Sequence, residues 1–127
     1  MNLLEELAHH LEFCGFGTVA SEEEDGNIHW ARMPDSPDSC ICVYSTDSGV
    51  PTSENGARIQ IMNRSNKTRE AYETSADIAN ELDGFHGFLN GNGRLVRISV
   101  ENAACGIGTD TKKREMYTTN IRVHYCY

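Results

Sequence analysis

A basic turn near the C-terminus holds the residues of this sequence best suited to chemistry. Asp110 is followed within four positions by Lys112, Lys113 and Arg114. If these side chains converged, the carboxylate could act as a general base and the cations could bind a phosphate or carboxylate. Side chains in a tight turn before a strand mostly point apart into water, however, and aspartate flanked by lysine is a common turn composition. We therefore interpret the segment as a turn that leads into a strand.

Two other segments contain residue types that bind metals. The carboxylates of residues 22–25 precede Gly26, but placing this glycine at the sixth position of a calcium loop puts Arg32 where the bidentate glutamate belongs. Cys40 and Cys42 lie two apart in a predicted strand and point to one face, without a second Cys or His pair at zinc-site spacing. We expect no metal and no other cofactor, and we interpret the two cysteines as small buried hydrophobes.

The sequence also lacks the common motifs of enzymes. Gly106-Ile107-Gly108 has neither the third glycine nor the following helix of a dinucleotide fingerprint. A phosphate-loop lysine pattern, a nucleophile elbow and a paired-histidine metal motif are all missing. The sequence therefore predicts a protein that is not an enzyme. A small hydrolase stays an alternative, although its nucleophile and base cannot be named.

Charge is distributed unevenly over the 127 residues, whose net charge is −8. Residues 1–63 hold eleven acidic and two basic residues, whereas residues 64–127 hold eight acidic and nine basic ones. The acidic half would repel phosphates, so we expect no direct nucleic-acid binding. The asymmetry permits head-to-tail packing of subunits, acidic surface against near-neutral or basic surface. Solubility is the simpler explanation of the acidic face.

Length and composition suit a single domain that spans residues 1–127. No apolar run approaches the roughly 20 residues of a membrane span, so no membrane contact is expected. The N-terminal segment carries Glu5 and Glu6 where an export signal would have Lys or Arg. The five cysteines are an odd number, which favours a reducing, intracellular site of assembly.

Periodicity predicts two helices. The first begins near Asn2, which with Glu5 has the form of a capping box, and ends at Gly15. Its apolar face consists of Leu3, Leu4, Leu7, Leu11 and Cys14. The second covers residues 68–83 and ends at Gly84. Small residues in its apolar stripe would let this helix lie close on a sheet.

Alternation of polar and apolar residues predicts five strands. They are residues 27–33, 39–44, 57–63, 94–101 and 114–125. Residues 45–56 are expected to form a long polar loop, residues 85–93 a turn-rich connection and residues 104–113 a further loop. The inner face of the fourth strand carries Val96, Ile98 and Val100. One face of the last strand carries Tyr117, Thr119, Ile121, Val123 and Tyr125.

The closing segment carries a family resemblance. The turn of residues 110–114, followed by Tyr117, then Asn120-Ile121, Val123 and Tyr125, resembles the C-terminal signature of bacteriophage minor capsid and tail-terminator (tail-completion) proteins. The order of the predicted elements agrees over nearly the whole chain, whereas specific residues match only in the last third. A glycine commonly precedes the turn arginine in such sequences, and this chain has Lys113. The residue after the asparagine is often aromatic, and here it is Ile121.

The resemblance implies a fold and a role. The expected fold is α+β, with a mixed, mainly antiparallel sheet of about five to six strands and an N-terminal helix and one central helix packed on it. The implied role is a homo-oligomeric ring, typically of six copies, that caps the tail tube and joins it to the head. Its partners would be other copies of itself, the tail tube protein and the head–tail connector protein. It would belong to the virion tail or neck after assembly in the host cytoplasm.

Ring or tube contacts are expected in the loop of residues 45–56 and in the turn of residues 106–114, because both are polar and the first is long. The candidate interface residues are Asp47, Glu54, Arg58, Asp110, Lys112, Arg114 and Asn120. Two other roles stay open. The chain could be a neck or head-completion protein of the same virion, or, in a different class, an acidic inhibitor that mimics DNA.

Overall fold

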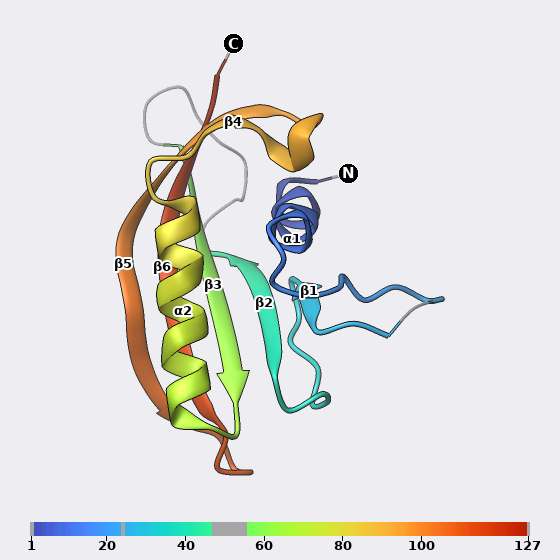
Figure 1. Ribbon diagram of the computed structural model, residues 1–127, viewed down its shortest axis with the longest axis vertical. Helices are drawn as coiled ribbons and strands as arrows, with labels where there is room; N and C mark the ends of the chain where they lie inside the picture. The colour runs from blue at the N-terminus through green and yellow to red at the C-terminus, as the bar shows by residue number, and fades with distance from the viewer. Residues whose placement is uncertain (1, 24, 47–55, 127) are drawn as a thin grey trace.

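Two helices cover one face of a six-stranded sheet (Figure 1). The computed structural model describes residues 2–23, 25–46 and 56–126. The elements are α1 (Leu3–Phe13), β1 (Ile28–Trp30), β2 (Cys40–Ser45), β3 (Ala57–Ser65), α2 (Thr68–Leu82), β4 (His86–Phe88), the 3₁₀ turn η1 (Leu89–Gly91), β5 (Leu95–Thr109) and β6 (Glu115–Tyr125). The strand order is β1-β2-β3-β6-β5-β4, in which β1 and β2 are parallel and the other neighbours are antiparallel. The expected α+β fold with a mixed, mainly antiparallel sheet is confirmed.

Local chemistry explains where the helices begin and how they pack. The Asn2 side chain accepts a hydrogen bond of 2.8 Å from the backbone N–H of Glu5, which caps α1 as its sequence predicts. The small residues of α2 bring that helix close to β6. The hydroxyls of Ser75 and Thr119 lie 3.0 Å apart, and the Asn63 side chain donates a 2.8 Å hydrogen bond to the Ala71 carbonyl.

The core lies between the helices and the sheet. Residues that alternate along each long strand point into it, as expected for a sheet with one covered face. Its largest fully buried side chains include Leu7, Leu11, Ile28, Ile59, Ile61, Ile78, Leu82, Leu89, Ile98 and Ile121. The predicted inner faces are confirmed at Val96, Ile98, Thr119, Ile121 and Val123, all of which are buried.

Strand β2 differs from the others because both of its faces are covered. Ile41 and Val43 belong to the core, whereas Cys40 and Cys42 are buried on the face without helices. Burial raises the pKa of the Cys42 thiol to about 11, so this side chain stays protonated at neutral pH. The two cysteines are buried, as the sequence predicts, and neither forms a disulfide.

Three boundaries differ from those predicted. Strand β5 continues to Thr109 through residues that we expected to form a loop. Three irregularities between Val100 and Gly108 interrupt its pairing with β6, which hides the period of two in the sequence. The connection of residues 85–93 contains the short strand β4 and the turn η1. Strand β1 has only three residues of the predicted seven, since Ala31 has a φ of 69°.

Two isoleucines test this core. Replacing Ile121, which is fully buried in β6, with alanine should lower the free energy of unfolding by about 3 kcal/mol, because a cavity remains in the packed layer. Ile107 in β5 is 49% exposed, and the same substitution there should cost less than about 0.5 kcal/mol. Denaturant titration of both variants measures the difference. Equal losses would show that the burial of β6 is wrong.

Candidate assembly surfaces

The buried guanidinium of Arg114 is the centre of the predicted turn. Arg114 is 4% exposed, although the residues around it are polar. Its Nε donates to Asp110 Oδ2 at 2.8 Å, and its two terminal nitrogens reach Asp35 Oδ1 at 3.1 Å and Asp38 Oδ1 at 3.2 Å. It also donates to the backbone carbonyl of Asp35. The expectation that the side chains of this turn point apart into water is therefore wrong for Arg114.

Asp110 organises the turn itself. One oxygen of its carboxylate accepts hydrogen bonds from the backbone N–H groups of Lys112, at 2.9 Å, and Arg114, at 3.0 Å. The backbone N–H and the guanidinium of Arg114 hold the pKa of Asp110 at about 2, below its ordinary value of 3.8. Lys113 has a φ of 61°, a conformation that favours glycine. This explains why glycine suits the position before the turn arginine.

A second arginine fixes the connection between β1 and β2. Arg64 of β3 is 5% exposed, and it donates to the backbone carbonyls of Asp35, at 3.3 Å, Pro37, at 2.7 Å, and Asp38, at 3.2 Å. Lys112 adds an ion pair to the Asp35 carboxylate. Residues 31–39 are thereby held over the helix-free face of the sheet. Sequence reasoning missed this group, because the partners of Arg114 lie 76 and 79 positions away.

Arg58 and Asn120 lie together on the helix-free face, apart from the turn. Asn120 Oδ1 accepts a 3.2 Å hydrogen bond from Gln60, and Arg58 Nε lies 4.0 Å from Glu101. They line a cavity of about 300 Å³ with Thr46, Ile59, Glu101, Asn102 and Ile121. Of the seven candidate interface residues, the structure thus groups Asp110, Lys112 and Arg114 at one end of the sheet and Arg58 with Asn120 elsewhere. Asp47 and Glu54 lie outside the described residues.

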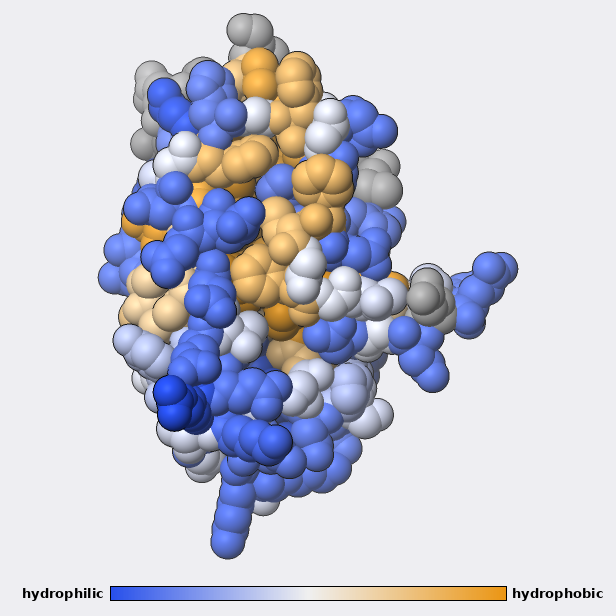
Figure 2. All heavy atoms as spheres, in the orientation of Figure 1, coloured by the Kyte–Doolittle hydropathy of each residue, from blue (hydrophilic) through white to orange (hydrophobic). Residues whose placement is uncertain are grey.

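Apolar side chains form a further surface between α1 and α2 and near β4 (Figure 2). Phe13 is 66% and Phe88 is 55% exposed, which is unusual for such large side chains. Beneath them His10 lies 4.8 Å from the Phe85 ring and accepts a 3.0 Å hydrogen bond at Nδ1 from the Asn90 backbone. Burial lowers the pKa of His10, which keeps this acceptor nitrogen neutral. Sequence reasoning missed this surface, since Phe13 lies off the leucine stripe of α1.

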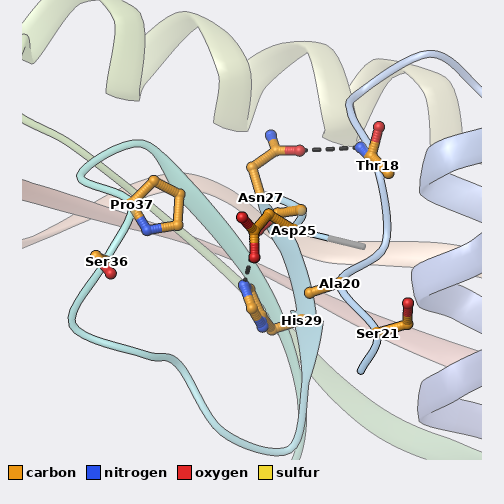
Figure 3. A pocket seen from close by; sticks show the side chains of 9 residues that line it. Thr18, Ala20, Ser21, Asp25, Asn27, His29, Ser36 and Pro37 are labelled. Carbon is orange, nitrogen blue, oxygen red and sulfur yellow. Dashed lines mark hydrogen bonds between the residues drawn. The ribbon is translucent and has the colours of Figure 1, made fainter. Parts of the chain in front are cut away.

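A cavity of about 710 Å³ is an open cleft lined in part by Ala20, Ser21, Asp25 and Gly26 (Figure 3). Asn27 accepts a 2.9 Å hydrogen bond from the Thr18 backbone, and His29 Nε2 lies 3.1 Å from the Gly26 carbonyl. These polar groups brace the loop. Within residues 2–23, 25–46 and 56–126, no cluster of His, Cys, Asp or Glu could hold a metal ion. Neither α1 nor α2 has the length and apolarity that a membrane crossing requires.

A comparison with known families assigns the chain. Residues 16–127 match the family described as bacteriophage tail terminator protein. The chain belongs to this family. Neither the curated proteins nor the solved structures gave a significant match. Tail terminators are structural proteins, so the chain is a structural component of a phage tail with a role in its assembly.

Removing the buried guanidinium should weaken the tail terminator fold. Arg114→Ala removes the side-chain donor of the Asp110 carboxylate, one of the two arginine donors of the Asp35 carbonyl, and the ion pairs to Asp35 and Asp38, so we expect the melting temperature to fall by about 5 °C or more. Lys112→Ala removes only an exposed ion pair, so this variant should change the melting temperature by about 2 °C at most. Calorimetry of both variants is the measurement. A negligible effect of Arg114→Ala would contradict the structural role of this group.

The same turn makes stability depend on acidic pH. The pKa of Asp110 in the folded chain, about 2, lies below its ordinary value of 3.8. The carboxylate therefore stabilises the fold at pH values above about 4, and this contribution disappears as the pH falls toward 2. Asp110→Asn should be less stable than the parent chain at pH 6, with a difference that shrinks by pH 2. Denaturant titrations across this range test the expectation, and a constant difference would refute it.

Proposed function

We propose that this tail terminator forms a homo-oligomeric ring that caps the tail tube and joins it to the head. The observation that carries the proposal is the family match over residues 16–127. The whole chain would act as one domain without catalytic activity. The tail tube protein, the head–tail connector protein and further copies of the chain would be its partners. Assembly would take place in the host cytoplasm, and the ring would lie at the neck of the virion.

The geometry supports rigid contact surfaces. Arg114 and Arg64 fix residues 31–39 and the turn of residues 110–114 against the same end of the sheet. A surface that is already ordered loses little conformational entropy on binding, which suits the repeated, identical contacts of a ring. The exposed rings of Phe13 and Phe88 add apolar area of the kind that oligomer interfaces bury.

Tube capping can be measured directly. We expect purified chain to migrate as a closed ring in native mass spectrometry and to stop the elongation of tail tube protein in vitro. Electron microscopy would show tubes shorter than those grown without the chain, with an extra ring at one end. Heat-unfolded chain serves as the control. Tubes of unchanged length and a chain that stays monomeric would refute the proposal.

The loop before β3 provides a separate test. Candidate residues Asp47 and Glu54 belong to it, and Thr46 at its start donates from its backbone to the Arg58 carbonyl at 3.1 Å. Deleting residues 48–54 should reduce ring yield or tube binding at least severalfold while leaving the melting temperature within a few degrees, because the deletion removes none of the core residues that the structure describes. If ring formation and tube binding both persist at the parent level, the loop is not a contact segment.

A further inference from the structure

Three arginines lie close together on the helix-free face of the sheet. Arg58 of β3 lies directly opposite Arg122 of β6, and Arg97 of β5 lies opposite His124 of β6. Like charges opposite each other on neighbouring strands destabilise the pairing. Glu101 offsets part of this charge, with its carboxylate 3.4 Å from Arg122 and 4.0 Å from Arg58.

The arginine cluster (Arg58, Arg97 and Arg122) carries excess positive charge. Across residues 56–60, 95–102 and 119–125, its three guanidinium groups face the single carboxylate of Glu101, in a chain whose net charge is −8. Arg58 and Arg122 both have contacts within the chain, so neither is unpaired, and what distinguishes the cluster is its excess of positive charge. The Arg58 side chain is 60% exposed. The excess indicates an anionic partner.

An acidic arm (residues 20–23, 25 and 26) leads into β1, the edge strand of the sheet. It projects beyond β1, away from the sheet, and it is hydrophilic (Figures 1 and 2). Glu22, Glu23 and Asp25 on this arm are exposed. The arm and the arginine cluster are separated by β2, because the cluster begins on β3 and continues to β6 and β5.

The base of the arm is held in place. The Ala20 backbone donates to the Ile28 carbonyl at 3.0 Å, and the Ile28 backbone donates to Thr18 at 3.0 Å. A side chain at Gly26 would come within 2.3 Å of the Thr18 carbonyl, so only glycine fits where the arm returns. Figure 3 shows Asn27 and His29 bracing the same base from within the cleft. The fold thus holds the base of the acidic arm in one position, although the carboxylates of the arm repel one another.

We propose that the acidic arm of one copy docks on the arginine cluster of the next copy. The two surfaces have opposite charge and do not overlap, because the cluster lies on β3, β6 and β5 and the arm leads into β1, so each copy can use both at once. A contact between two unlike surfaces repeats head to tail and closes into a ring when the rotation allows. This inference rests on the proposed ring and names the contact that closes it.

Charge exchange tests the contact. Variant one carries Arg58→Glu and Arg97→Glu, and variant two carries Glu22→Lys and Glu23→Lys. Each alone should lose ring assembly by about tenfold or more, since each variant sets like charges against each other across the contact. An equimolar mixture should assemble, because each reversed surface then meets its complement on the other variant. Native mass spectrometry of the mixture should show rings in which the two variants alternate.

Matched controls separate this contact from general charge effects. Arg69→Glu and Asp77→Lys reverse exposed charges on α2 and should leave assembly unchanged. If either double variant is poorly folded by circular dichroism, the milder pair Arg58→Gln and Arg97→Gln should still lower ring yield severalfold. Raising the salt concentration from 0.05 to 0.5 M should weaken wild-type rings, since the contact is electrostatic.

The outcomes distinguish the two levels of the proposal. Variants that assemble like the parent chain, or a mixture that fails to assemble from two folded variants, would overturn the arm-to-cluster contact. Rings that ignore salt would overturn it as well. A parent chain that stays monomeric and leaves tube growth unchanged would instead refute the proposed terminator ring itself.

Discussion

The structure depends on how one buried charge, the guanidinium of Arg114, is satisfied. A guanidinium has five N–H donors and cannot lose its charge, so its burial requires acceptors on several sides. Asp110 supplies them from the turn, and Asp35 and Asp38 supply them from the connection between β1 and β2. Removing this group would free two segments that are distant in sequence. The turn, the connection and the end of β6 therefore form one unit.

The parallel pairing of β1 with β2 explains why such a clamp is needed. A chain that enters two neighbouring strands in the same direction must cross over one face of the sheet between them. Here the crossing lies on the face without helices and has no strand partners for its carbonyls. Arg64 and Arg114 supply the missing hydrogen bonds, because their guanidinium groups donate to carbonyls of residues 35–38. The same crossing covers Cys40 and Cys42 and positions β1, from which the acidic arm extends.

The sequence predicts what is local and misses what is distant. The apolar stripe of α2 and the alternation in β6 repeat every few residues, so both elements are visible in the sequence. The environment of Arg114 is invisible there, because an aspartate–lysine turn has the same composition whether it is solvated or clamped. Strand β5 was missed beyond residue 101, since its irregular pairing breaks the alternation. The aromatic surface around Phe13 arises from a contact between α1 and η1.

The division of charge follows from the same architecture. Most apolar side chains are buried between the helices and the sheet. The buried arginines form their hydrogen bonds and ion pairs with the turn and with the connection between β1 and β2. The charges left on the surface are therefore not needed to fold a single copy. Arg58 and Arg122, which lie opposite each other on β3 and β6, and the carboxylates that crowd on one arm each cost stability in isolation. In the proposed head-to-tail contact, the two unfavourable clusters would neutralise each other.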